Sequence, residues 1–99
     1  MVHFLIEILR IRDRATYEQY LRQAEPILRS FGGAYVFRSE LFEVVSGDWD
    51  VQRFVCISFP NTDRLKQCFA SEAYARISHL RKESVESRAV IIDPGLRPD

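Results

Sequence analysis

Arg53-Phe54-Val55-Cys56-Ile57-Ser58-Phe59-Pro60 is the stretch that decides the fold, and it runs directly into an amphipathic segment over 62–81. Seven residues of strand character end at a proline, which cannot donate a hydrogen bond to a sheet ladder. A helical pattern follows, with Asn61 or Thr62 as its cap and one apolar stripe that continues beyond Ser71 with a small offset. The stretch is therefore a strand followed by a helix with a local bend at Ser71.

The residues before this unit predict a second pairing of a strand with a helix. Val2 to Arg10 alternates in character with a period of two, and one face of it is wholly apolar. Asp13 is suited to cap a helix whose apolar residues recur every three or four positions, and Gly32-Gly33 ends it. Because Pro26 removes one intrahelical hydrogen bond, we expect a kink or a fresh helical start near Glu25.

Two further strands complete the pattern. Residues 34–45 are rich in Tyr, Val and Phe and predict one long strand, which should form a hairpin with 53–59 through the turn at Ser46-Gly47-Asp48. Residues 88–93 predict the final strand, after which Pro94-Gly95 ends the ordered part. We therefore expect a single domain over 1–99 with an ordered core of about 2–93.

The order strand, helix, strand, strand, helix, strand is typical of a ferredoxin-like α+β fold, βαββαβ. Such a fold has a four-stranded antiparallel sheet with two helices on one face. The other face would carry Leu5, Leu9, Phe54 and Cys56, which is more apolar surface than a monomer ordinarily exposes. We therefore expect a homodimer that closes the two sheets face to face.

Charge and cysteine content limit the partners and the compartment. Fourteen basic residues balance fourteen acidic ones, so neither nucleic acid nor a membrane surface is an expected partner. The apolar run from Phe4 to Leu9 is interrupted by Glu7 and lacks the basic region of a signal peptide. Cys56 and Cys68 have no C-x-x-C spacing and predict buried free thiols in a reduced, cytoplasmic protein.

A family resemblance adds to this reading. The residues that carry it are Tyr20, Ala24, Pro26, Phe31-Gly32-Gly33-Ala34-Tyr35, Arg38, Gly47-Asp48-Trp49, Arg53, Phe59-Pro60, Ser71-Glu72-Ala73-Tyr74 and Arg81. In their order and spacing the chain resembles the domain of unknown function 1330 family over roughly Phe4 to Gly95. The resemblance implies a dimeric α/β barrel, in the same broad group as antibiotic-biosynthesis-type monooxygenases and muconolactone isomerases. It implies no particular reaction.

The chain departs from the family pattern at three places. Ser58 stands where the family often has a carboxylate before the Phe-Pro pair. Cys68-Phe69 replaces a frequent Trp-Tyr, and Glu72-Ala73 replaces a common proline-glutamate. A catalytic role for the missing carboxylate is therefore not expected here.

Six residues are candidates for a ligand site. Arg38 is the first, because a guanidinium in mid-strand must be paired or solvated and suits a carboxylate or enolate, although a salt bridge to Glu40 or Glu7 would also explain it. The others are two aromatic walls, a general base near the chain start and two arginines that the family resemblance favours, namely Trp49, Tyr74, His3, Arg53 and Arg81. The same residues also have structural explanations. Trp49 and Tyr74 could simply pack against neighbours, His3 could be an exposed strand residue, and Arg53 and Arg81 could connect loops to helix ends.

Two functions from different classes fit these observations. The first is a cofactor-free enzyme or binder of a small carboxylated or aromatic metabolite, held inside the barrel. The second is a non-catalytic dimerisation or stress-associated module, since the sequence has no nucleophile and base pair, no phosphate loop and no metal-ligand set. Neither a metal nor another cofactor is expected, because the two histidines have no carboxylate at ligand spacing.

Overall fold

The computed structural model describes residues 1–95. Its elements are β1 (Val2–Ile11), α1 (Arg14–Ser30), β2 (Ala34–Ser39), β3 (Arg53–Phe59), α2 (Thr62–Ala70), α3 (Glu72–Ala75), α4 (Ser78–Ser84) and β4 (Val85–Ile92). The strands form one antiparallel sheet in the order β2-β3-β1-β4. This arrangement confirms the predicted ferredoxin-like α+β fold. The end of the predicted domain, beyond Gly95, lies outside the described residues.

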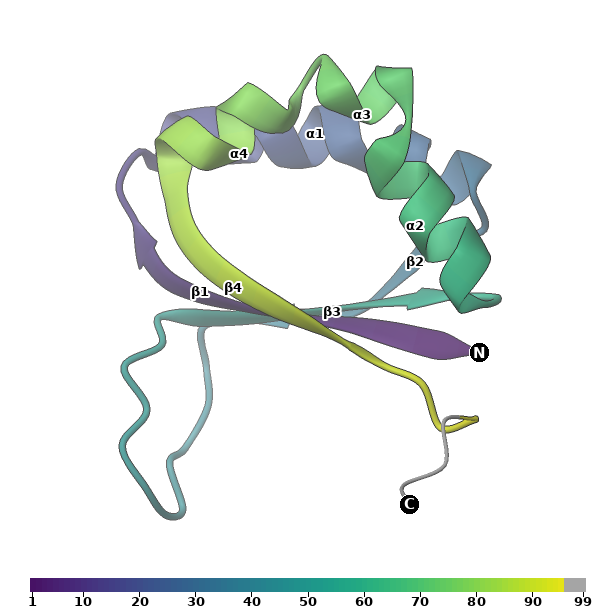
Figure 1. Cartoon of the computed structure of the whole chain (residues 1–99). Helices are drawn as coiled ribbons and strands as arrows, with labels where there is room; N and C mark the ends of the chain where they lie inside the picture. The colour runs from purple at the N-terminus through teal and green to yellow at the C-terminus, as the bar shows by residue number, and fades with distance from the viewer. Residues whose placement is uncertain (96–99) are drawn as a thin grey trace.

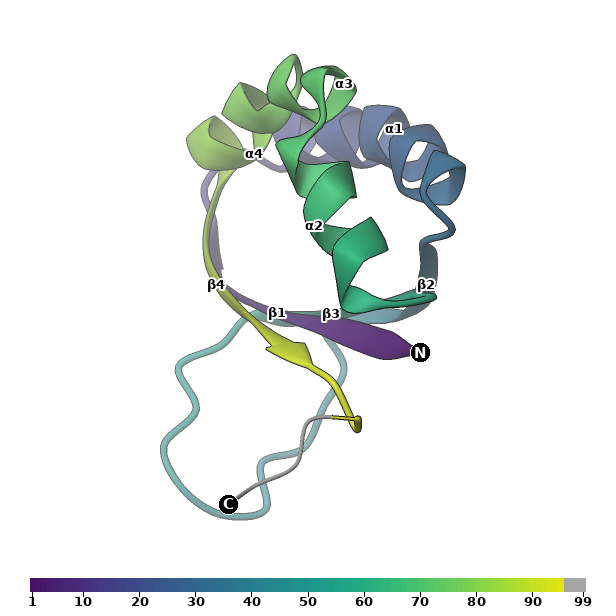
Figure 2. The ribbon, with the colours of Figure 1, turned by 45° about the vertical axis from the view of Figure 1, so that its right-hand side comes forward.

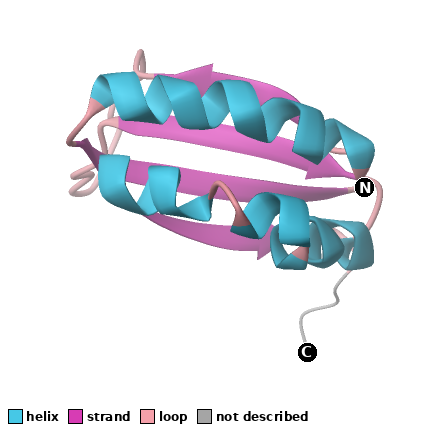
Figure 3. Cartoon of the chain, turned by 90° about the horizontal axis from the view of Figure 1, so that it is seen from above, coloured by secondary structure: helices cyan, strands magenta, loops and turns pink. Residues whose placement is uncertain are grey.

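All helices lie on one face of the sheet (Figure 1). Seen from above, α1 follows one half of the sheet, while α2, α3 and α4 follow the other half (Figure 3). Among residues 1–95 the opposite face carries no helix, and the connection between β2 and β3 extends on that side (Figure 2). Within residues 1–95, no helix has the length and apolar character needed to cross a bilayer. The chain therefore has a covered inner face and an uncovered outer face.

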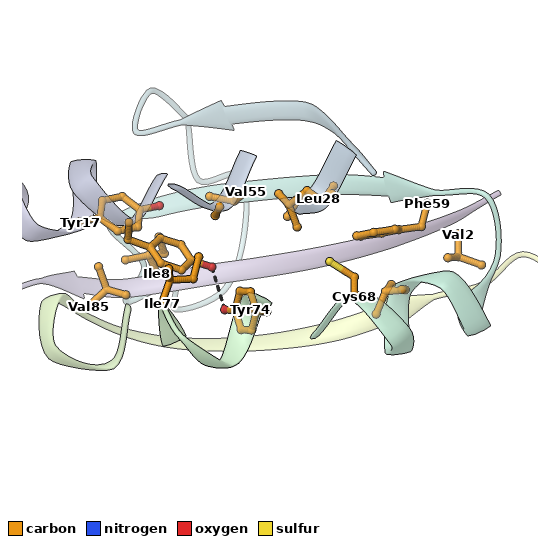
Figure 4. Close-up of a cluster of buried hydrophobic side chains, with 14 residues drawn as sticks. Val2, Ile8, Tyr17, Leu28, Val55, Phe59, Cys68, Tyr74, Ile77 and Val85 are labelled. Atoms are coloured by element: carbon orange, nitrogen blue, oxygen red, sulfur yellow. Dashed lines mark hydrogen bonds between the residues drawn. The ribbon is translucent and has the colours of Figure 1, made fainter. Parts of the chain in front are cut away.

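The strand register decides which side chains enter the core. Phe4 lies opposite Ile57, and Ile6 lies opposite Val55, so these side chains share the inner face. Figure 4 shows the resulting layer of buried side chains between sheet and helices, in which Phe59 is almost fully buried. The predicted alternation of β1 is thus confirmed.

The first helix begins and ends as the sequence predicted. The Asp13 carboxylate accepts the backbone N–H of Thr16 at 3.1 Å. Gly32 follows the helix with a φ of +82°, and a Cβ at that position would come within 2.8 Å of Pro60, so glycine is required there. The predicted fresh start near Glu25 is wrong, because α1 continues through Pro26. Pro26 lies on the exposed side, where water can bond the carbonyl it leaves free.

The second helical region is more divided than predicted. The break at Ser71 is confirmed, since its hydroxyl accepts the N–H of Tyr74 at 3.1 Å and donates to the carbonyl of Cys68 at 2.6 Å. A second break at Ile77, which the sequence pattern did not predict, separates α3 from α4. The final strand also begins earlier than predicted, at Val85.

Residues 34–45 do not form the single long strand that their composition predicted. β2 ends at Ser39, which faces Phe54 near the start of β3, so the residues beyond it have no strand to pair with. The Glu40 carboxylate instead bonds Arg14 at 2.9 Å and Arg53 at 3.5 Å. Residues 40–52, the β2–β3 arm from here on, then extend away from the sheet (Figure 1).

Candidate functional site

A cavity of about 480 Å³ lies between the helices and the inner face of the sheet, on the side of β4. We call it the inner cavity. Its lining comes from β1, α1, the second helical region and β4, and includes Phe4, Ile6, Tyr20, Phe69, Tyr74, Ala75, Ser78, Arg81, Lys82, Ser87, Arg88 and Ala89. The volume falls within the range typical of sites for small organic ligands.

Three hydroxyls and one guanidinium form the polar centre of this cavity. The hydroxyl oxygens of Tyr20 and Tyr74 lie 2.8 Å apart and share a hydrogen bond, which is the dashed line at Tyr74 in Figure 4. Arg81 donates from Nε to the Tyr74 hydroxyl at 3.2 Å and from Nη1 to the Ser87 hydroxyl at 3.3 Å. These residues come from α1, α3, α4 and β4, so the site exists only in the folded chain.

Local structure positions the two main polar residues. The cap at Ser71 starts a new helical turn, which directs Tyr74 toward the core, where it is 6% exposed. Arg81 lies in the last turn of α4, where a positive charge interacts favourably with the helix dipole. The two breaks in the second helical region therefore bend it around the cavity.

The charged residues of the lining are all basic. Arg81 and Lys82 line the inner cavity, and among residues 1–95 no carboxylate does so. Arg88 also borders the cavity, but it lies opposite Glu7, on the outer face of the sheet. Arg88 is paired with Glu7, but among residues 1–95 no carboxylate forms a salt bridge with Arg81. A half-buried guanidinium bonded only to neutral hydroxyls leaves its positive charge uncompensated. The inner cavity is therefore suited to an anion.

Aromatic rings make up the apolar wall. The Phe69 ring centroid lies 4.9 Å from that of Phe4 and 4.8 Å from that of Tyr74. Phe69 thus connects the apolar floor of the cavity to its polar centre. A flat ligand could contact these rings while an anionic group reaches Arg81.

Burial controls the protonation of the inner tyrosine. Loss of hydration raises the pKa of Tyr20 far above its ordinary value, and the neighbouring Tyr74 raises it further. Tyr20 therefore keeps its proton under all ordinary conditions and acts as a neutral hydroxyl.

Arg38 lies outside the inner cavity. It faces Val55 from the edge strand β2, and its guanidinium carbon sits 4.3 Å from the centroid of the Tyr35 ring. The alternative explanation of Arg38, a salt bridge to Glu40 or Glu7, does not hold either, because Glu40 bonds Arg14 and Arg53, while Glu7 bonds Arg88 at 2.6 Å. A cation–π contact at the sheet edge replaces the expected ion pair.

Arg53 occupies the beginning of β3, at the foot of the β2–β3 arm. Its guanidinium carbon lies 5.6 Å from the centroid of the Tyr17 ring, and its Nη1 reaches Glu40. The Nε of Arg53 is buried and has no partner among the described residues. The contacts of Arg53 connect the β2–β3 arm to α1, and the Arg53 side chain does not line the inner cavity.

His3 and Trp49 lie on the outer side of the sheet. His3 faces Ser58 and Ile92 across the neighbouring strands. Trp49 belongs to the β2–β3 arm, where its Nε1 donates to the carbonyl of Ser46 at 2.8 Å, and it helps to line an outer groove of about 380 Å³ with Phe54. The structure therefore separates these two residues from Tyr74 and Arg81.

The site contains residues that the sequence reasoning did not propose. Tyr20 falls at the three-and-four spacing of the apolar stripe of the first helix, which indicates a core residue, and Ser87 lies just before the strand predicted over 88–93. The one sequence signal for Tyr20 is the tyrosine hydroxyl, which a core phenylalanine lacks and which requires a hydrogen-bond partner when buried. In the part of the chain that the structure describes, no cluster of three or more His, Cys, Asp or Glu is placed to hold a metal.

Comparison with known proteins gives one family match. The family described as Domain of unknown function (DUF1330) matches residues 3–94, which is almost the whole chain. No curated protein matches the sequence.

Solved structures of similar fold come from several sources. A protein of unknown function from Rhodopseudomonas palustris, RPA0582, has a TM-score of 0.81 and 20% identity over 98% of this chain and 83% of its own. SnoaB, a cofactor-independent oxygenase from Streptomyces nogalater, has a TM-score of 0.67 and 13% identity over 97% and 94% of the two chains. An antibiotic biosynthesis monooxygenase has a TM-score of 0.62 and 19% identity over 94% and 97%. At such identities the likeness concerns the fold alone.

Proposed function

The chain belongs to the DUF1330 family of domains of unknown function, and from that premise we propose that it binds a small anionic aromatic molecule in the inner cavity and acts on it without a cofactor. One observation carries the proposal. The guanidinium of Arg81 lies in the inner cavity without a carboxylate partner among residues 1–95.

Physical chemistry explains why this arrangement favours an anionic ligand. Partial burial costs a charged group part of its hydration, and an opposite charge restores that loss. In most proteins a neighbouring carboxylate provides it, but among residues 1–95 no carboxylate lines the inner cavity or forms a salt bridge with Arg81. A ligand anion would complete the site, while its ring contacts Phe4 and Phe69.

The fold supports chemistry that needs no cofactor. SnoaB, which shares this fold, is a cofactor-independent oxygenase. The inner cavity here offers hydroxyl and guanidinium donors, which can stabilise a negative charge that develops on a bound substrate. This likeness is one of fold, so the reaction rests on the chemistry of the cavity rather than on the neighbour's name.

Ligand binding can be tested without knowing the natural substrate. Thermal unfolding would be followed with a panel of benzoates and nitrophenolates, and with the neutral analogue benzamide. The anions should stabilise the protein, and Arg81→Met should weaken their binding by about ten- to a hundredfold, the value of one charge-assisted hydrogen bond. Arg76→Met is the matched control, because Arg76 is an exposed arginine whose salt bridge among residues 1–95 is with Glu72, away from the inner cavity. Equal stabilisation by benzamide would contradict the proposal.

We further propose that the outer face binds a second copy of the chain. Large apolar side chains remain exposed there and on the arm, including Phe37, Leu41, Trp49, Val90 and Ile92. Removing them from water would stabilise a dimer by about 25 cal/mol per Å² of apolar area. Sedimentation at micromolar concentration tests this, and a stable monomer would contradict it.

The same outer face supports the second candidate function, a non-catalytic dimerisation module. The two candidates differ in one measurement, since a module needs the dimer but no ligand. Failure of every anion in the panel, together with a stable dimer, would favour the module. The buried free thiols of Cys56 and Cys68 suit a reducing compartment, so we place the protein in the cytoplasm, which cell fractionation would test.

A further inference from the structure

The hydrogen bonds around Tyr74 specify the ligand more closely than its charge does, and this inference rests on the proposed function. An arginine side chain only donates hydrogen bonds, so the bond at 3.2 Å uses the Tyr74 oxygen as the acceptor of the Arg81 Nε–H. The oxygen of Tyr20, at 2.8 Å, is the second polar neighbour of the same hydroxyl.

The two tyrosine hydroxyls have one proton more than they use. Together they hold two protons, and the bond between them takes one. Within residues 1–95, neither hydroxyl has another hydrogen-bond acceptor. Both residues line the inner cavity, so the remaining proton is available to whatever binds there.

Tyr74 is the hydroxyl that presents this proton. Either hydroxyl can donate in the bond between them, but only Tyr74 also accepts the Nε–H of Arg81 among the described residues. The arrangement in which Tyr20 donates therefore leaves the Tyr74 proton free beside the guanidinium. When Tyr20 and Arg81 both donate to the Tyr74 oxygen, its own O–H is polarised and becomes a stronger donor toward the cavity. The N–H groups of Arg81 not used by Tyr74 and Ser87 lie beside it.

We propose that Tyr74 and Arg81 form an oxyanion site for a phenolate or enolate, with Tyr20 as the donor behind Tyr74. The Tyr74 oxygen accepts a hydrogen bond from the Nε–H of Arg81. That N–H is therefore not available for the bidentate geometry in which a carboxylate bonds Nε and a neighbouring Nη. A single oxygen carried directly by a ring suits the donors that remain. The Phe69 ring, 4.8 Å from that of Tyr74, would then contact the ring of the ligand.

A coloured phenol tests this site directly. 4-Nitrophenol changes its absorbance when it ionises, so the ionisation of the bound probe can be followed against pH. The bound probe should ionise at least about one pH unit below the free probe, a tenfold preference for the phenolate. Tyr74→Phe should remove most of this shift, and Tyr20→Phe should reduce it although Tyr20 only supports Tyr74. Ser58→Ala is the control and should leave the shift unchanged, because it removes a hydroxyl on the outer face, where Ser58 lies opposite His3 and bonds the carbonyl of Ala34.

The outcomes separate this inference from the proposed function. If neither the probe nor any benzoate binds, or if both bind Arg81→Met equally well, the proposed function fails. If benzoates bind but the probe does not, only the oxyanion site is refuted. If binding requires Arg81 but the ionisation shift survives in Tyr74→Phe and Tyr20→Phe, only the oxyanion site is refuted. Equal weakening of benzoate binding by Tyr74→Phe would refute the assignment to an oxygen carried by the ring. Should Tyr74→Phe not fold, Tyr20→Phe alone decides the result.

Discussion

Replacing Tyr74 by phenylalanine should destabilise the protein even when no ligand is bound. The substitution keeps the ring that packs against Phe69 and removes only the hydroxyl. It deletes the bond to Tyr20 at 2.8 Å and the acceptor of the Arg81 Nε–H at 3.2 Å. Tyr20 is only 8% exposed, so its hydroxyl would be left buried without a partner.

The magnitude follows from these two losses. A neutral hydrogen bond contributes about 1 kcal/mol, and the bond to Arg81 adds less than its full value because water in the cavity can replace the lost acceptor. Tyr74→Phe should therefore cost about 1–2 kcal/mol of the free energy of unfolding. Tyr20→Phe removes only the neutral bond and should cost about 1 kcal/mol.

Denaturant unfolding of the two single variants and the double variant provides the test. Because the two hydroxyls bond one another, the double variant should lose no more than Tyr74→Phe alone. Protein concentration must be held constant, since association would change the apparent stability. Losses that simply add would refute the reasoning, because they would mean that the two hydroxyls do not interact in the folded chain.

Three other predictions follow from separate features. Bonding to Arg14 holds the pKa of Glu40 below its ordinary value of 4.5. The stability that this pair provides should therefore be present above pH 4.5 and be lost as the pH falls further. Glu40→Gln should flatten that part of a curve of unfolding free energy against pH. Leu5→Lys should weaken the proposed dimer by placing an unpaired charge in its interface, and an unchanged mass in sedimentation would contradict this. Burial raises the pKa of Cys68 to about 11, so iodoacetamide should modify it only after unfolding, and labelling of native protein would contradict its position.

The sequence alone determined the order of the elements and the two faces of the sheet. These features depend on local periodicity, since alternation along β1 assigns Phe4 and Ile6 to one face whatever else the chain does. Helix ends were predictable for the same reason, because Asp13 and Ser71 satisfy backbone groups only three residues away.

Residues that pair across the fold required the tertiary structure. Residues 41–45 have strand composition, yet a strand needs a partner, and β3 begins too late in the sequence to pair with them. Spacing allowed Glu40 to pair with Arg38, two positions away, but Glu40 bonds Arg14. Spacing along the chain showed which charges were near in sequence, but not which would be near in space.

The candidate site divides in the same way. Tyr74 and Arg81 were proposed from the sequence, and both line the inner cavity. Their grouping with Tyr20, 54 positions before Tyr74, follows only from the packing of α1 beside α3 and α4. Trp49 was proposed with Tyr74 as an aromatic wall of a ligand site but lies on the opposite side of the sheet. Residue type suggested which side chains could bind a ligand, whereas the face of the sheet and the crossing of the helices decided which of them meet.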